Sequence, residues 1–322
     1  MVLLVYVDDI ILAGNNHDEC TAFKRYLHEC FHIKDLGSLK FFLGIEVARL
    51  RIGISLCQKK YALDILAETG LLGSNPAETP MKQGHKLALA EGKEIDGAAY
   101  RQLVCRLIYL TITRLEISYL VHVLSQFAQV PRKEYFEAAM RVVGYIKGSP
   151  GQGILLRSNC DLRLGAYYDS DWVSCPITRR LVSGYFITIR ESPISWKMKK
   201  QSTVSRLSAE VEYRAMAAVM SELVWLKSLL TSFLVDHRQL MELFCDNQSA
   251  IHIVVNPVFH EQTKHFEIDC HFFREQVQTR NIVMAHIRSQ FQPADIFTKA
   301  LARQQFHFLL GKLGIHDVFA PT

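Results

Sequence analysis

The sequence lacks the features of a secreted or membrane protein. Its eight cysteines are scattered, with no Cys-x-x-Cys pair and no spacing typical of a disulfide framework, so we interpret them as reduced structural thiols. The first apolar run is interrupted by Asp8 and Asp9 and is too short to span a membrane, and no basic start or small-residue cleavage site marks a secretory signal. We therefore expect an intracellular protein, in the cytoplasm or nucleus, with no membrane partner.

Internal repeats, low-complexity tracts and a dominant charge of one sign are also missing. The chain has 37 Lys and Arg against 32 Asp and Glu, a net charge of +5. This weak basic bias permits a polyanionic partner without demonstrating one. Because 49% of the 322 residues are hydrophobic, the chain can bury a large core, and its length suggests more than one domain.

Two adjacent acids interrupt the first apolar run, "LLVYVDDIILAG". Asp8 and Asp9 separate two β-prone halves, and Gly14-Asn15-Asn16 follow as turn residues, so we predict two strands pinched around the acids. A pair of carboxylates in a buried apolar hairpin needs a cation or hydrogen-bond donors. The run therefore predicts a metal-binding hairpin.

The first half of the chain changes from mixed to helical patterns. We predict a strand pair in "FFLGIEVARL" and "GISLCQ", and a loop over Leu71–Gly97, where Gly, Pro, Ser and charged residues accumulate. Helices are predicted over Asp18–Phe31, residues 59–70, Tyr100–Thr113, Ile117–Gln129 and Lys133–Lys147. Because "GSPGQG" ends the last helix, we divide the chain into residues 1–80, 81–150 and 151–322.

The second half has the element order of an α/β fold. Three strands are predicted in "RLGAYYD", "SGYFITI" and "PISW", followed by a long helix from Ser208 to about Leu234. A strand in "MELFCD", a short helix capped by Asn247, a strand in "NIVMAHI" and a closing helix over "QPADIFTKALARQQFHFLLGKLG" come next. This order requires at least one crossover connection.

Four acids in this half fall where the predicted elements would aim them at one point. Asp169 and Asp246 end strands, Glu212 lies in the first turns of the long helix, and Asp295 lies in the first turn of the closing helix. Converging carboxylates repel one another unless divalent cations hold them, and a pair of Mg²⁺ ions about 3.5–4 Å apart is the recurrent solution. The pattern predicts metal-dependent hydrolysis of a phosphodiester.

Each acid also has a purely structural interpretation. Asp246 and Asp295 would each favour a helix N-terminus even without a metal. Glu210 competes with Glu212, and only one of the two can join the site because they point to nearly opposite sides of a helix. Asp171 competes with the acid two residues before it, which shares its strand face. Periodicity alone leaves both choices open.

Several spaced segments together carry a resemblance to a known family. They are "YVDDIILAG", "KDLGSLKFFLGIEV", "YRQLVCRLIYLTITR", "DSDW", "SAEVEYRAM", "CDNQSAIHIVVNPVFHEQTKHFEIDCHFFRE" and "ADIFTKAL". In this order they resemble the Pol polyprotein of copia-type LTR retrotransposons, from the C-terminal part of the reverse transcriptase through the ribonuclease H domain. The resemblance covers essentially the whole chain.

For the second half, the resemblance implies a fold, a site and a reaction. Residues 151–322 would form an α/β ribonuclease H-like domain, a mixed five-stranded sheet with flanking helices. Its metal-binding acids would be Asp169, Glu212, Asp246 and Asp295, which selects among the competing acids. They would bind two Mg²⁺ ions, with Mn²⁺ as an alternative, and cleave the RNA strand of an RNA–DNA hybrid. Other Pol or Gag products would be further partners.

For the first half, the resemblance implies a partial α+β polymerase palm over residues 1–80 and a helical thumb or connection over 81–150. Asp8 and Asp9 would be the paired metal-binding aspartates of the polymerase. A further such aspartate and the fingers precede this hairpin in the family, so we expect no polymerase activity from this chain alone. Cys105 and Leu115-Glu116 replace the usual glycine and Pro-Asp, which we interpret as the drift of a decayed copy.

A basic run with interleaved aromatic residues, "RRLVSGYFITIRESPISWKMKKQSTVSR", is the candidate surface for the hybrid. We predict phosphate contacts from Lys199 and Lys200, with a solvated sheet edge as the alternative. Asn247, Gln248 and Ser249 directly follow an acid of the site and would touch the minor groove, although capping explains Asn247 equally well.

The segment "FHEQTKHFEIDCHF" offers His260, His265, Cys270 and His271 as zinc ligands. No second pair of ligands at zinc-finger spacing follows, so zinc is disfavoured. We instead predict that Lys264 and His265 face the substrate or solvent.

Intact acids do not guarantee a functional pocket. The alternative to a hydrolase is a catalytically silent transposon relic that retains at most nucleic-acid binding. Hybrid binding without cleavage would favour this alternative.

Overall fold

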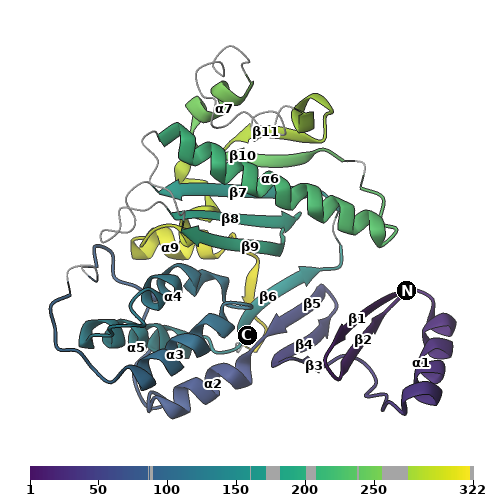
Figure 1. Ribbon diagram of the computed structural model, residues 1–322, viewed down its shortest axis with the longest axis horizontal. Coiled ribbons are helices and arrows are strands. Elements are labelled where there is room, and N and C mark those ends of the chain that lie inside the picture. The colour runs from purple at the N-terminus through teal and green to yellow at the C-terminus, as the bar shows by residue number, and fades with distance from the viewer. Residues whose placement is uncertain are drawn as a thin grey trace.

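Two five-stranded sheets and a separate hairpin organise the part of the chain that the structure describes (Figure 1). This computed structural model describes residues 1–85, 87, 90–159, 161–171, 182–200, 208–237, 239–255 and 275–319. Only the backbone is described for residues 171, 208–214 and 252–255.

The sheet of the second half has the order β11-β10-β7-β8-β9. Its strands are β7 (Leu164–Asp171), β8 (Val182–Ile189), β9 (Ser192–Lys200), β10 (Met241–Cys245) and β11 (Ile282–His286). The strands β7, β8 and β9 are antiparallel neighbours, whereas β10 runs parallel to both β7 and β11. The helices α6 (Ser208–Ser232) and α7 (Gln248–Val255) lie in the crossovers that these parallel pairs require. This topology confirms the predicted mixed five-stranded sheet with flanking helices.

The two faces of this sheet have different covers. On one face, Tyr168 and Tyr185 pack with an apolar stripe of α6, which Figure 1 shows lying across the sheet; the stripe consists of Ala215, Met216, Val219, Met220, Leu223 and Leu226. On the other face, Phe186 packs with the short 3-10 helix η5 (Pro293–Phe297). Because side chains alternate along a strand, Asp169 lies on the η5 face.

The other large sheet joins strands from distant parts of the chain. Its order is β12-β6-β5-β4-β3, and every neighbouring pair is antiparallel. Its strands are β3 (Phe41–Phe42), β4 (Ile45–Leu50), β5 (Gly53–Cys57), β6 (Gln152–Arg157) and β12 (Ile315–Asp317). Sequence analysis predicted β4 and β5 but not β6 and β12. The domain boundary at residue 150 stays a prediction. Both β6 and β12 lie after this residue, yet they join the sheet that contains β3, β4 and β5.

Helices of the first half pack into one apolar core. They are α2 (Lys59–Glu68), α3 (Gly97–Leu110), α4 (Ser118–Ser125) and α5 (Lys133–Lys147), with the 3-10 helix η2 (Leu115–Ile117) before α4. Their positions agree with the predicted helices to within a few residues at each end. The helix α1 (His17–Phe31) begins at Asn16, whose side chain accepts hydrogen bonds from the first-turn amides. Within the described residues, no helix has the length and apolarity needed to cross a bilayer.

A buried ion pair links these helices to β6. Arg114 Nε donates to Glu116 Oε1 at 2.6 Å, and Arg114 Nη1 donates to the carbonyl oxygen of Ser149 at 2.7 Å. Both charged side chains are at most 1% exposed. The position interpreted as drift, Glu116, therefore carries a specific contact at the turn that leads into β6.

The N-terminal hairpin has the predicted pairing but not the predicted burial. The strands β1 (Val2–Tyr6) and β2 (Asp9–Ala13) pair with Tyr6 opposite Asp9, so the turn falls at Val7-Asp8. Asp8 and Asp9 are exposed, and so are the side chains of Leu4, Val5 and Tyr6. The prediction of a buried hairpin is wrong because no other described element covers it.

The predicted closing helix is also wrong as a single element. The chain instead forms η4 (Ser289–Phe291), then η5, and then the separate helix α9 (Arg303–Leu310). Ile296 and Phe297 of η5 insert into a cluster with Phe186 of β8, and the helical pattern breaks after them. Tertiary packing thus overrides a helical periodicity that is continuous in the sequence.

Candidate active site

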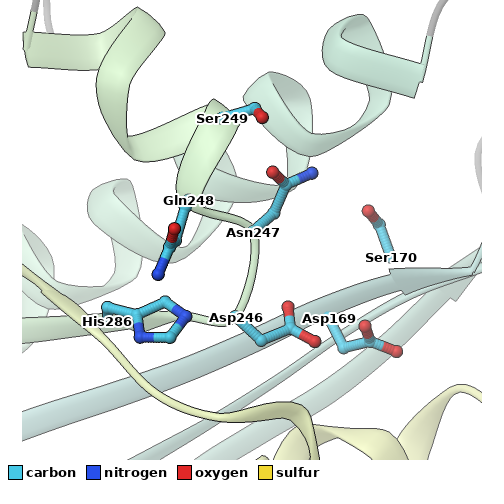
Figure 2. A pocket seen from close by; sticks show the side chains of 7 residues that line it. All are labelled: Asp169, Ser170, Asp246, Asn247, Gln248, Ser249 and His286. Carbon is cyan, nitrogen blue, oxygen red and sulfur yellow. The ribbon is translucent and has the colours of Figure 1, made fainter.

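Two of the predicted acids meet at the ends of neighbouring parallel strands. Phe244 of β10 pairs with Tyr167 of β7, and continuing this register by two residues sets Asp246 level with Asp169. Figure 2 shows the two carboxylates next to each other. Parallel strands place their carboxyl ends at one edge of a sheet, so the arrangement follows directly from the topology.

A cavity of about 520 Å³ opens beside these two acids. Its lining consists of Asp169, Ser170, Asp246, Asn247, Gln248, Ser249 and His286 (Figure 2). The hydroxyl of Ser289 donates to Asp246 Oδ2 at 2.9 Å, which fixes one side of that carboxylate. Asn247 Oδ1 accepts from the amide of Ala250 at 3.1 Å, so Asn247 does cap α7 while it lines the cavity.

The third acid, Asp295, reaches the sheet through the docking of η5. Gln292 is fully buried; its Nε2 donates to the carbonyl oxygen of Tyr168 at 3.0 Å, and its Oε1 accepts from Ala294 N at 3.4 Å. Gly184 lies opposite Asp169 in β8, and a Cβ there would come within 2.7 Å of Phe297 Cβ. A side chain at position 184 would thus displace η5, and with it Asp295.

A lysine and a threonine join Asp169 to Asp295. Lys299 Nζ lies 3.3 Å from Asp169 Oδ2 and 3.0 Å from Asp295 Oδ1. The hydroxyl of Thr298 donates to the same oxygen of Asp169. Asp169 and Asp295 are each 7% exposed, so the site holds two buried carboxylates and one ammonium group.

Burial and mutual repulsion change the acidity of this group of residues. Burial, together with the nearby Asp169, raises the pKa of Asp295 to about 7. Burial also raises the pKa of Asp169, against the opposing influence of Lys299 and Thr298. Burial lowers the pKa of Lys299, but the two carboxylates outweigh that effect and raise it above its ordinary value. Both carboxylates can therefore be ionised at the same time only if positive charge lies close to them.

The donor set suits a hard divalent cation. Carboxylate oxygens are the ligands that Mg²⁺ and Mn²⁺ prefer. Asp295 Oδ1 is buried, and its neighbour among the described residues is the ammonium of Lys299 at 3.0 Å. Among the described side chains, no three His, Cys, Asp or Glu residues are gathered tightly enough to form a complete ligand set. The residues fit the cation in chemistry and charge, and a complete set would need a further ligand.

The other predicted site residues fall into three groups. Glu212 lies in α6 as predicted, but its side chain is outside the described part of the chain, and so are Lys264 and His265 and the zinc candidates of that segment. Asp8 and Asp9 lie at the exposed turn of the separate hairpin. The remaining two, Lys199 and Lys200, lie in β9.

Lys199 and Lys200 lie on opposite faces of the sheet. Met198 pairs with Gly184, which pairs with Asp169, so these three positions share one face. Lys199 therefore belongs to the α6 face, and Lys200 to the Asp169 face. Lys200 Nζ donates to Gln126 Oε1 at 2.8 Å, which places its ammonium beside α4.

Sequence analysis missed residues of three kinds: Ser170 and His286, which line the cavity; Gln292, which holds η5 against the sheet; and Ser289, Thr298 and Lys299, which contact the acids. A usable signal existed for the last two, because they follow Asp295 by three and four residues, the spacing of neighbours on one helical turn. No local signal marks Gln292 or Ser289, whose partners are distant in sequence.

Comparison with solved structures finds partial likenesses. An RNase H1 isolated from compost, LC11-RNase H1, has 14% sequence identity and a TM-score of 0.34, covering 47% of this chain and 99% of that chain. The foamy viral protease-reverse transcriptase, solved in complex with an RNA/DNA hybrid, has 11% identity and a TM-score of 0.49, covering 89% of this chain and 36% of that chain.

Comparison with known sequences gives closer matches. The family described as "Reverse transcriptase (RNA-dependent DNA polymerase)" matches residues 1–83. An uncharacterized mitochondrial protein of Arabidopsis thaliana is 39% identical over 70% of this chain and 94% of its own length. The retrovirus-related Pol polyprotein from transposon RE1 of Arabidopsis thaliana is 40% identical over 98% of this chain. The corresponding protein from transposon TNT 1-94 of Nicotiana tabacum is 30% identical over 98% of this chain.

The chain spans 22% of the RE1 polyprotein and 24% of the TNT 1-94 polyprotein. The matches to these polyproteins extend over both halves of the chain, and the reverse transcriptase match lies at its start. The chain therefore belongs to the retrovirus-related Pol polyproteins of copia-type transposons.

Proposed function

We propose that this chain hydrolyses the RNA strand of an RNA–DNA hybrid with the help of bound divalent metal ions. The observation that carries the proposal is the meeting of three acids from separate elements, with Asp169 and Asp246 on a cavity and Asp295 held against Asp169 through Lys299. Two buried carboxylates that repel each other, with a third acid at the adjacent cavity, support a functional rather than a stabilising role.

The residues that would hold the metal ions are Asp169, Asp246, Asp295 and Glu212. Bound Mg²⁺ or Mn²⁺ would activate water and stabilise the leaving oxygen of the phosphodiester. The position of Glu212 supports its choice over Glu210. It precedes Ala215 and Met216, which pack toward the sheet, by three and four residues, the spacing of one helix face.

Residues around the cavity would bind and orient the hybrid. Gln248 and Ser249 are exposed at the start of α7 and supply amide and hydroxyl groups beside the acids. These groups match the hydroxyls and base edges that an RNA-containing duplex displays in its minor groove. His286 borders the cavity across from Asp169 in Figure 2, where its imidazole would carry a proton to or from the reacting phosphate.

The test is cleavage of an end-labelled RNA–DNA hybrid by the purified chain in Mg²⁺. Asp169→Asn keeps the shape of the side chain and removes one metal-binding charge, so we expect it to abolish cutting. Asp161→Asn is the matched control, because it makes the same change at an exposed acid outside the site. Cutting of the RNA strand by the wild type and Asp161→Asn alone would support the proposal.

Two further substrates sharpen the test. Single-stranded RNA and duplex DNA of the same sequence should resist cleavage if the hybrid is the substrate. A folded wild-type protein that binds the hybrid and never cuts it would refute hydrolysis and favour the silent relic.

The match of residues 1–83 to the reverse transcriptase family raises the separate question of polymerase activity. The prediction that this chain alone does not polymerise is tested by primer extension on an RNA template. Templated synthesis by the isolated chain would contradict it.

A further inference from the structure

Lys299 occupies the position between two of the acids where positive charge is needed. Its ammonium lies 3.0 Å from Asp295 Oδ1 and 3.3 Å from Asp169 Oδ2, so one cation serves both carboxylates. The two carboxylate side chains are 9% and 8% exposed, whereas the lysine side chain is 36% exposed. The acids are fixed inside the protein, and their counter-ion reaches them from the surface.

The contacts of the two acids show why they stay in place. Asp169 belongs to a central strand and accepts a hydrogen bond from Thr298, which is fully buried. Asp295 belongs to η5, which Gln292 and the packing of Phe297 hold against the sheet. Without a cation, two buried carboxylates this close would repel each other and destabilise the docking of η5. Lys299 reduces this repulsion.

A metal ion and the ammonium group compete for the same oxygens. Mg²⁺ binds oxygen at about 2.0–2.1 Å, so an ion shared by these carboxylates would lie in the space that Nζ now fills. The ion and the ammonium group cannot occupy the same space, so the ammonium must leave before the ion binds there. The long flexible lysine stem allows the ammonium to move out to solvent, which the carboxylates cannot do.

We propose that Lys299 is an internal counter-ion of the metal-free site, which a divalent cation must displace in order to bind. This inference rests on the proposed metal site and adds its regulation. It has two consequences of opposite sign: Lys299 stabilises the protein without metal, and it weakens the binding of metal. A lysine with a purely structural role would have the first effect only.

The test compares wild type, Lys299→Met and Lys299→Arg as full-length chains. The melting temperature is measured in EDTA and in saturating Mg²⁺, and the Mg²⁺ dissociation constant is measured by calorimetry. Lys93→Met is the matched control, because Lys93 is exposed and lies outside the site. None of these readouts depends on hydrolysis.

We expect Lys299→Met to melt at a lower temperature than wild type in EDTA. Its melting temperature should rise by more than that of wild type when Mg²⁺ is added. Its Mg²⁺ affinity should rise by about tenfold or more, because a competing charge has been removed. Lys299→Arg should lower the Mg²⁺ affinity, because a guanidinium binds two carboxylates more firmly than an ammonium does. This variant keeps the counter-ion, so it decides the question even if Lys299→Met fails to fold.

The outcomes separate this inference from the proposed function. Equal Mg²⁺ affinity in wild type, Lys299→Met and Lys299→Arg would overturn the counter-ion role and leave the metal site standing. Mg²⁺ binding to none of the proteins would overturn both. Tighter binding to Lys299→Met together with weaker binding to Lys299→Arg would support the inference, whether or not the hybrid is cleaved.

Discussion

Replacement of Asp295 by asparagine should stabilise the metal-free protein at neutral and alkaline pH. Burial and the neighbouring Asp169 raise the pKa of Asp295 from 3.8 to about 7. The folded state therefore holds a proton on Asp295 more tightly than the unfolded state does, and stability falls as the pH rises from about 4 to about 7. Asparagine has the same shape and no charge, so it removes this loss.

The size of the expected stabilisation follows from the change in the pKa of Asp295. About three pKa units at about 1.4 kcal/mol each correspond to about 4 kcal/mol once the group is fully ionised. Asp295 is only 7% exposed, so solvent screening is weak, but it shares Lys299 with Asp169 and the two acids do not act independently. We therefore expect Asp295→Asn to raise the free energy of unfolding by about 2–4 kcal/mol at pH 8 and by little at pH 4.

Urea unfolding in EDTA at several pH values measures this difference. Trp196 is a suitable fluorescence probe, because it lies in β9 and its Nε1 donates to the carbonyl oxygen of Thr111, between the sheet and the helical core. Asp161→Asn serves as the control for a carboxylate-to-amide change. A variant less stable than wild type at pH 8, or a difference that does not grow with pH, would refute the reasoning. In saturating Mg²⁺ the wild type should become more stable than Asp295→Asn, because the ion binds the intact carboxylate of the wild type.

Three more predictions test the packing around the site, the junction and the substrate surface. Gly184→Ala should cost about 1–3 kcal/mol of stability by pushing Phe297 off the sheet, measured as a lower melting temperature together with slower hydrolysis. Glu116→Gln should cost about 3–5 kcal/mol in urea unfolding, because the buried charge of Arg114 loses its carboxylate partner, and replacing both residues by methionine should cost less than the sum of Arg114→Met and Glu116→Met. Lys199→Ala, which removes an exposed charge from β9, should lower the slope of log affinity for the hybrid against log salt by about one in fluorescence anisotropy; an unchanged slope would assign Lys199 to the solvated sheet edge.

Local patterns predicted most of the secondary structure because they report on local backbone and on the direction of burial. The predicted and observed helix ends coincide at Lys133–Lys147. Val219 and Leu223 of the long helix pack against the sheet, as the helical spacing of their apolar side chains predicts. The same reasoning failed for the closing helix, since periodicity cannot reveal that Ile296 and Phe297 insert into a distant sheet face. It failed for the burial of the N-terminal hairpin for a related reason, because an apolar strand is buried only if another element covers it.

By itself, the sequence determined the order of strands and helices from β7 to β11 and the four candidate acids of the second half. Which of these acids meet was decided by tertiary structure: the parallel pairing of β10 with β7 sets Asp246 beside Asp169, and the docking of η5 adds Asp295. The same docking brings Thr298 to Asp169 across 129 residues of sequence and inserts Lys299 between two carboxylates. The spacing of Thr298 and Lys299 after Asp295 indicates that they lie near that acid, but their contacts with Asp169 depend on long-range packing, which no local pattern of side chains encodes.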